Sequence, residues 1–156
     1  MLTVDIPGRA PLEISHLALD LNGTLATDGC VPPTVISRLH DLAVIVHLHI
    51  LTADTFGMAA SLVGVEAQVT VLGPGEQTEA KARIIRALGI SRTAAIGNGM
   101  NDEAMLREAA VGILVIGAEG AAVRSLLAAD LVVGSIEDAL DLFRFPKRLV
   151  ASLRTG

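Results

Sequence analysis

The stretch His16-Leu17-Ala18-Leu19-Asp20-Leu21-Asn22-Gly23-Thr24 contains the residue with the clearest chemical potential in the chain. Its first residues are mostly apolar or small, as in a strand buried on both faces, and the Asn-Gly pair then predicts a turn. Asp20 lies where the apolar run ends. A carboxylate at the rim of a core is costly unless it is paired, holds a metal or reacts, so Asp20 is the first candidate for a functional residue.

Two further polar clusters follow apolar strands in the same way. The predicted strand 44–51 leads into Thr52-Ala53-Asp54, and the predicted strand 93–97 leads into Asn98-Gly99-Met100-Asn101-Asp102. Open parallel sheets bind ligands outside the carboxyl ends of their strands. If these strands are neighbours, the three polar clusters meet at one edge and predict a ligand site there.

Lys81 lies on the apolar stripe of a predicted helix. It shares one helical face with Ile84, Ile85 and Leu88, at spacings of i, i+3, i+4 and i+7. Two interpretations fit this position. The side chain could pass the core and reach solvent, as long side chains commonly do, or its ammonium could reach an anion near the strand ends.

The elements that must position these residues follow an alternating pattern. Residues 2–6 and 12–14 predict an N-terminal hairpin, and Pro146 is expected to end the last main helix before a short helical tail at 147–154. Strands are predicted at 16–21, 44–51, 68–72, 93–97, 111–116 and 131–133, and helices at 34–43, 55–63, 76–88, 101–110, 119–128 and 135–143. This α/β alternation implies a mostly parallel sheet with helices on both faces, in one domain spanning 1–156.

Composition narrows the class of protein. Of the 156 residues, 51% are hydrophobic but only 2% are aromatic, so the core must consist of Ala, Val, Leu and Ile. The net charge of −5 argues against a general binder of nucleic acid or anionic membranes. No apolar run is as long as a membrane span, and the N-terminus lacks the features of a signal peptide. The single cysteine, Cys30, cannot form an internal disulfide, so a cytoplasmic location is expected.

The ordered polar clusters resemble the four motifs of the haloacid dehalogenase-like (HAD) superfamily. The resemblance covers residues 20–102, and the flanking strands fit the three-layer Rossmann-like fold of that family. The chain is also similar to its soluble P-type ATPase-like branch, including the stretch 51–57. The matching segments are Asp20-Leu21-Asn22-Gly23-Thr24, Thr52, Lys81 and Gly97-Asn98-Gly99-Met100-Asn101-Asp102. The resemblance implies a Mg²⁺-dependent phosphatase that acts on a phosphorylated small molecule or phosphoryl donor.

The resemblance also implies catalytic and phosphate-binding roles. Asp20 would be the nucleophile that accepts a phosphoryl group as an aspartyl-phosphate. Thr52 would donate a hydrogen bond to a phosphoryl oxygen, and Lys81 would offset the charge of Asp20 and of the phosphate. Backbone amides around Leu21, Asn22 and Ala53 would supply further donors.

The implied cofactor is Mg²⁺, which prefers oxygen ligands. The ligands would be Asp20, the backbone carbonyl of Asn22 and an oxygen from the loop 97–102, where Asn98 and Asp102 are the candidates. Asn98 stands where the usual loop has a metal-binding aspartate. This difference predicts weaker Mg²⁺ binding unless Asp102 makes the direct contact.

Asn22 is the second departure from the family pattern. Most phosphatases of the superfamily have an aspartate at this position as general acid and base, whereas asparagine exchanges no proton at neutral pH. Since general acid–base help contributes about 10²–10⁴-fold, slow turnover is expected. Asp54 is the other nearby carboxylate that could move a proton. The alternative function is a regulatory module that binds phosphate or a phosphometabolite with little or no turnover.

The spacing of the motifs leaves no room for a cap domain. Only residues 25–33 separate Thr24 from the next predicted helix, and the 28 residues between Thr52 and Lys81 already hold one helix and one strand. An open site accepts a bulky substrate or is closed by a neighbouring subunit. We favour a homo-oligomer, because excluding water strengthens charge stabilisation. His47 and His49 have the spacing of a metal pair, but packing is the favoured interpretation.

Overall fold

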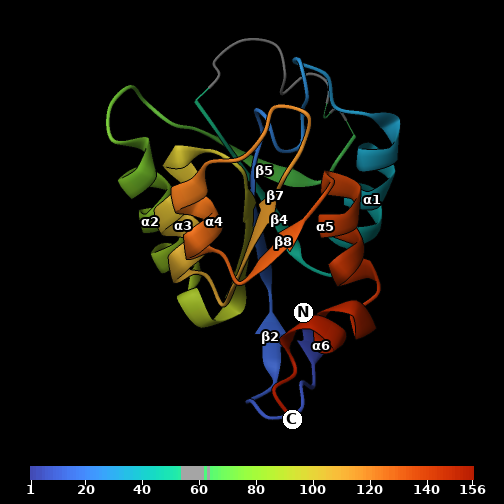
Figure 1. Ribbon diagram of the computed structural model, residues 1–156. Helices are drawn as coiled ribbons and strands as arrows, with labels where there is room; N and C mark the ends of the chain where they lie inside the picture. Colours follow the sequence, from blue (N-terminus) through green and yellow to red (C-terminus); the bar gives the residue numbers. More distant parts are fainter. Residues whose placement is uncertain (54–61, 63) are drawn as a thin grey trace.

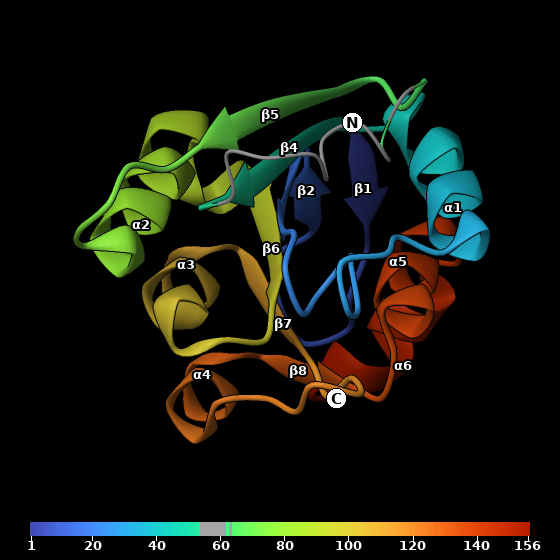
Figure 2. The same cartoon turned by 90° about the horizontal axis from the view of Figure 1, so that it is seen from above.

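A six-stranded parallel sheet forms the centre of the computed structural model, which describes residues 1–53, 62 and 64–156. The strand order is β5-β4-β3-β6-β7-β8, so β3 and β6 lie in the middle (Figures 1 and 2). The strands are β3 (His16–Asp20), β4 (His47–Thr52), β5 (Ala67–Val71), β6 (Thr93–Gly97), β7 (Val111–Val115) and β8 (Leu131–Val133). The paired registers are parallel throughout this sheet.

Burial across the sheet explains the sequence pattern. Every residue of β6 and β7 is buried, as expected of short apolar runs with helices on both faces. The edge strands β5 and β8 are partly exposed and lack that continuous burial. The prediction of a parallel sheet with buried central strands is confirmed.

Helices cover both faces of the sheet. Figure 2 shows α2, α3 and α4 on one side, and α1, α5 and α6 on the other. The helices are α1 (Pro33–Ala43), α2 (Gln77–Leu88), α3 (Glu103–Glu108), α4 (Val123–Ala128), α5 (Ile136–Arg144) and α6 (Lys147–Leu153), with 3₁₀ turns η2 (Ile90–Arg92) and η3 (Met100–Asp102). The α/β fold has no cap over the sheet edge in the described part of the chain, as predicted.

Two predicted boundaries were wrong for physical reasons. The strand predicted at 44–51 begins at His47, because the amides of Ile45 and Val46 both donate to the carbonyl of Leu42 and finish the last turn of α1. The helix predicted at 119–128 begins at Val123. The preceding residues form a loop with a turn from Gly117 to Gly120.

Smaller differences occur at two other helices. The helix predicted at 101–110 is divided into η3 and α3, and α5 ends at Arg144, so Pro146 caps the start of α6 instead of ending α5. The tail helix is confirmed. Of the helix predicted at 55–63, residues 55–61 and 63 lie outside the described residues.

The hairpin predicted at the N-terminus is confirmed as a separate two-stranded sheet. β1 (Leu2–Val4) pairs antiparallel with β2 (Leu12–Ile14). It connects to β3 through Ser15, whose amide donates to the carbonyl of Arg92 and whose carbonyl accepts from the amide of His47.

Within the described residues, no helix has the length and apolar character required to cross a membrane.

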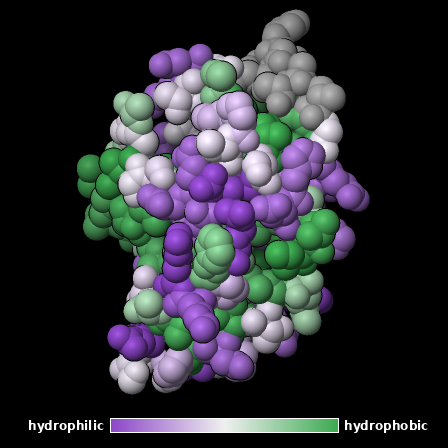
Figure 3. Space-filling model, turned by 90° about the vertical axis from the view of Figure 1, so that its right-hand side faces the viewer, coloured by the Kyte–Doolittle hydropathy of each residue, from purple (hydrophilic) through white to green (hydrophobic). Residues whose placement is uncertain are grey.

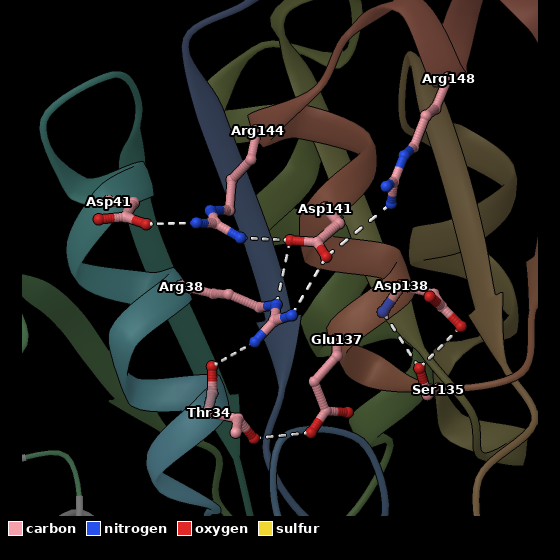
Figure 4. A network of polar contacts seen from close by, with 9 residues as sticks. All are labelled: Thr34, Arg38, Asp41, Ser135, Glu137, Asp138, Asp141, Arg144 and Arg148. Carbon is pink, nitrogen blue, oxygen red and sulfur yellow. Dashed lines mark hydrogen bonds and ion pairs between the residues drawn. The ribbon is translucent and has the colours of Figure 1, made fainter.

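An ion-pair network joins α1 to α5 on one face of the molecule, where hydrophilic side chains gather (Figure 3). Arg38 donates two hydrogen bonds to the carboxylate of Asp141, at 3.0 and 3.2 Å, and Arg144 donates a third at 2.6 Å (Figure 4). Burial alone would raise the pKa of Asp141, but these hydrogen bonds outweigh it and hold the pKa below its usual value. The network therefore fixes α1 and α5 to each other, although the two helices lie far apart in the sequence.

Candidate active site

The three polar clusters meet at the carboxyl edge of the sheet. β3 ends at Asp20 and lies between β4, which ends at Thr52, and β6, which is followed by Asn98. The side chains of these three residues, with those of Lys81 and Asp102, are buried. A buried group of polar and charged side chains at this edge is the arrangement expected of a ligand site in an open α/β sheet.

Lys81 reaches from α2 into this edge. Its Nζ lies 2.6 Å from Asp20 Oδ1 and 2.6 Å from Asp102 Oδ1. The residue is only 1% exposed, so the ammonium does not pass the core to solvent. Of the two interpretations of this lysine, the structure supports the one in which it reaches an anion.

Asp102 holds both Lys81 and the loop that follows β6. Its Oδ2 accepts hydrogen bonds from the backbone amides of Asn98 and Gly99, each at 2.9 Å, while Oδ1 accepts from Lys81. A β-carbon on Gly97 would lie 2.5 Å from Asp102 Cγ, so the strand must end in a glycine here. Both carboxylate oxygens are engaged, which favours a positioning role for Asp102 over direct contact with a metal.

Burial and the neighbouring side chains together set the pKa values of Asp20 and Lys81. Burial raises the pKa of Asp20, as does the negative charge of Asp102, and the opposing effects of Lys81 and Thr24 leave that pKa at about 6. Burial would lower the pKa of Lys81, but Asp102 and Asp20 outweigh it and raise that pKa. Lys81 is therefore a stable ammonium at neutral pH. With both carboxyls ionised, the three side chains carry one net negative charge, which suits a bound cation.

Thr24 links Asp20 to Asn98, a role that no sequence pattern indicates separately. Its hydroxyl lies 2.9 Å from Asp20 Oδ2 and 3.1 Å from Asn98 Oδ1. A hydroxyl has one proton, so it cannot donate fully to both oxygens at once. A hydrogen bond from Asn98 Nδ2 to the carbonyl of Gly120, at 3.3 Å, orients the side-chain amide of Asn98.

Asp20 Oδ2 and Asn98 Oδ1 therefore both lie within hydrogen-bond distance of the Thr24 hydroxyl. Carboxylate and amide oxygens are the kind of ligand that Mg²⁺ prefers, so the chemistry of these two side chains, with the carbonyl of Asn22 as the third predicted ligand, fits this ion. Among the described residues, no three His, Cys, Asp or Glu side chains are arranged to hold a metal ion. The candidate set accordingly combines a carboxylate with amide and backbone oxygens.

The predicted phosphate-binding residues lie beside Asp20. Asn22 Nδ2 donates to Thr52 Oγ1 at 3.4 Å, which brings the turn after β3 next to the end of β4. Leu21 and Ala53 directly follow β3 and β4, so β3 ends one residue before the predicted strand 16–21 does. Asp54 lies outside the described residues.

His47 and His49 lie at the opposite end of the sheet. His16 Nδ1 is 3.0 Å from His49 Nε2, and the His16 ring stacks on His47. The three residues line a cavity of about 540 Å³ at the amino ends of β3, β4 and β5. Burial lowers the pKa of both His16 and His49. These histidines are separate from the Asp20 site, and hydrogen bonding and stacking within the cluster support the packing interpretation.

Solved structures identify the class of this fold. The 3-deoxy-D-manno-octulosonate 8-phosphate phosphatase of Moraxella catarrhalis, solved with magnesium, phosphate and KDO, superposes with a TM-score of 0.67 at 19% identity, covering 88% of this chain and 92% of that one. The cobalt-bound deoxy-D-mannose-octulosonate 8-phosphate phosphatase of Haemophilus influenzae gives a TM-score of 0.67 at 15% identity, covering 92% and 95%. The chain therefore has the fold of the HAD phosphatases.

A sequence relative identifies the family. The uncharacterized protein MJ0073 of Methanocaldococcus jannaschii is 44% identical over 84 residues, which are 51% of this chain and 90% of that protein. The chain belongs to the same family as MJ0073. No family model matches the chain. Since the relative is itself described as uncharacterized, the relationship gives the chain no activity.

Proposed function

We propose that the protein is a Mg²⁺-dependent phosphohydrolase or phosphotransferase that acts through an aspartyl-phosphate on Asp20. The observation that carries the proposal is the 2.6 Å contact between Lys81 Nζ and Asp20 Oδ1, in a buried site at the carboxyl edge of a HAD-like sheet. Phosphoryl transfer depends mainly on positioning and charge neutralisation, and this site offers both.

In the proposed reaction, an oxygen of Asp20 attacks phosphorus and the bond between phosphorus and the leaving oxygen breaks. Water then hydrolyses the aspartyl-phosphate, or another acceptor takes the phosphoryl group. Lys81 neutralises charge on Asp20 and on the incoming phosphate, and Thr52 donates to a phosphoryl oxygen. Asp102 is a positioning residue, because it holds the ammonium of Lys81 in place.

The Mg²⁺ ligands in this proposal are Asp20, the backbone carbonyl of Asn22 and Asn98 Oδ1. When bound, the ion supplies positive charge that stabilises the transferring phosphoryl group. The fold neighbours named above were solved with magnesium or with cobalt, which supports a divalent ion at this edge.

The substrate class follows from the same neighbours and from the open edge of the sheet. Their names specify a phosphorylated sugar acid, and we propose a phosphate monoester of a small molecule for this chain. We also propose that the chain belongs to the soluble P-type ATPase-like branch and that a homo-oligomer closes the uncapped site. The proposed location is the cytoplasm. The free thiol of Cys30 agrees with a reducing compartment.

The direct test is hydrolysis of p-nitrophenyl phosphate with Mg²⁺ and after chelation by EDTA. We expect turnover that stops on chelation and returns when excess Mg²⁺ is added, because charge neutralisation by the ion is part of the mechanism. A chain that binds inorganic phosphate but releases no nitrophenol under either condition would instead be the regulatory module. That second function is favoured by Asn22, whose amide donates to Thr52 and carries no exchangeable acid proton.

We expect Asn22→Asp to accelerate turnover of the same aryl phosphate by about 10²-fold, the lower end of the usual contribution of a general acid and base. The matched control is Asn22→Ser, which removes the amide contact with Thr52 without adding a titratable group. An acceleration confined to the aspartate variant supports missing proton transfer as the limit. Equal rates in wild type and Asn22→Asp would mean that another group already moves the proton.

A further inference from the structure

Glu119 lies in the loop 116–122, which connects β7 to α4 and reaches the active-site edge. This loop is fixed to Asn98 at two points: Asn98 Nδ2 donates to the carbonyl of Gly120 at 3.3 Å, and the amide of Ala122 donates to the carbonyl of Asn98 at 2.8 Å. Figure 1 shows the loop after β7 and the turn after β3 at the same upper edge of the molecule. The loop is therefore part of the site, although it contributes to none of the four motifs.

The carboxylate of Glu119 lies over Gly23, next to the candidate metal ligands. A β-carbon on Gly23 would be 2.9 Å from Glu119 Oε2, 2.7 Å from Asn98 Nδ2 and 3.2 Å from Asn98 Oδ1. Gly23 has φ +79°, so it is a glycine both for its backbone conformation and for the close approach of these two side chains. A carboxylate oxygen of Glu119 and the side-chain amide of Asn98 therefore lie around the same point above Gly23.

The proposed ligand set contains few negative charges, so a further carboxylate near it matters. The chain has a neutral amide at Asn98, and both oxygens of Asp102 are engaged by Lys81 and two backbone amides. Asp20 is thus the one ionised side chain of the proposed ligand set. Within the described part of the chain, the exposed side chain of Glu119 forms no hydrogen bond or ion pair with another residue, so its carboxylate remains available.

We infer that Glu119 is a further ligand of the divalent cation and supplies the second carboxylate that Asn98 does not. The inference rests on the proposed function, because it assigns a residue to the same cation site. It also explains why the loop 116–122 is tied to Asn98: the two hydrogen bonds hold the new carboxylate beside the amide that it complements.

The test measures binding of Mn²⁺ to the whole chain by electron paramagnetic resonance of the free ion, without substrate. We expect Glu119→Gln to weaken binding by about 10-fold or more, in the range seen when groups that support a metal site are removed. Glu13→Gln changes an exposed glutamate in the N-terminal hairpin and is expected to bind as wild type does. Adding Asn98→Asp to Glu119→Gln should restore the affinity, because it returns a carboxylate to the site.

The outcomes separate this inference from the proposed function. If Glu119→Gln binds Mn²⁺ as tightly as wild type while Asp20→Asn binds it more weakly, the cation site stands and Glu119 is not a ligand. If wild type does not bind Mn²⁺, both the ligand assignment and the metal-dependent function are overturned. Thermal unfolding of Glu119→Gln is expected to match wild type, since an exposed, unpaired carboxylate contributes little to stability.

Discussion

Asp20→Asn is expected to lower the turnover of an aryl phosphate by at least about 10⁴-fold, as losses of a catalytic nucleophile commonly do. An amide oxygen is a weaker nucleophile than a carboxylate, and it also neutralises one proposed ligand of the cation. The loss should appear in the rate of the chemical step, measured at saturating substrate and Mg²⁺, and no phosphoenzyme should accumulate.

The fold of Asp20→Asn should persist, so that the loss of activity can be attributed to chemistry. Asparagine has nearly the same shape, and Lys81 keeps its ion pair with Asp102 at 2.6 Å. The matched control is Asp5→Asn, which removes an exposed carboxylate next to the N-terminal hairpin. Circular dichroism should be unchanged in both variants. Full activity of Asp20→Asn would show that the phosphoryl group is not transferred to this residue.

The position of the site was predictable because strand ends are visible in the sequence. Apolar runs ending in Asp20, Thr52 and Asn98 place three polar groups at one edge once the strands are parallel neighbours, and the strand order confirms that they are. Helical phase put Lys81 on the buried face of its helix. Phase could not say where the ammonium ends, because a long side chain can leave the core in more than one direction.

The remaining contacts depend on tertiary structure that local patterns do not encode. Val44-Ile45-Val46 is typical of a strand, but its amides complete the last turn of α1. The helix predicted at 119–128 places Glu119 in a regular element instead of in the loop 116–122 that reaches the sheet edge. The approach of Glu119 to Gly23 becomes visible only when the loop after β7 and the turn after β3 lie side by side.

Lys81→Met should be the most destabilising of the substitutions considered, because it leaves two buried carboxylates without their shared cation. Removing one partner of a buried ion pair typically costs about 3–5 kcal/mol of unfolding free energy, and methionine preserves most of the side-chain volume. Turnover should fall as well, by about 10³-fold, since charge stabilisation of the transferring group is lost. Chemical denaturation and the aryl-phosphate assay measure the two effects.

Two comparisons separate this electrostatic cost from simple loss of packing. Lys147→Met, at the exposed start of α6, changes the same residue type and should leave stability near that of wild type. Adding Asp102→Asn to Lys81→Met removes one of the two unpaired charges and should recover part of the lost stability. A double variant no more stable than Lys81→Met would attribute the loss to packing.

The pH dependence of the Lys81→Met deficit provides the decisive check. The pKa of Asp20, already raised to about 6, should rise further once the ammonium that lowers it is gone. A carboxyl whose pKa is higher in the folded than in the unfolded chain gives stability that is present at low pH and lost as the pH rises through the folded value. The deficit relative to wild type should therefore shrink on acidification and grow towards neutral pH. A deficit independent of pH would contradict the charge cluster on which the proposed chemistry depends.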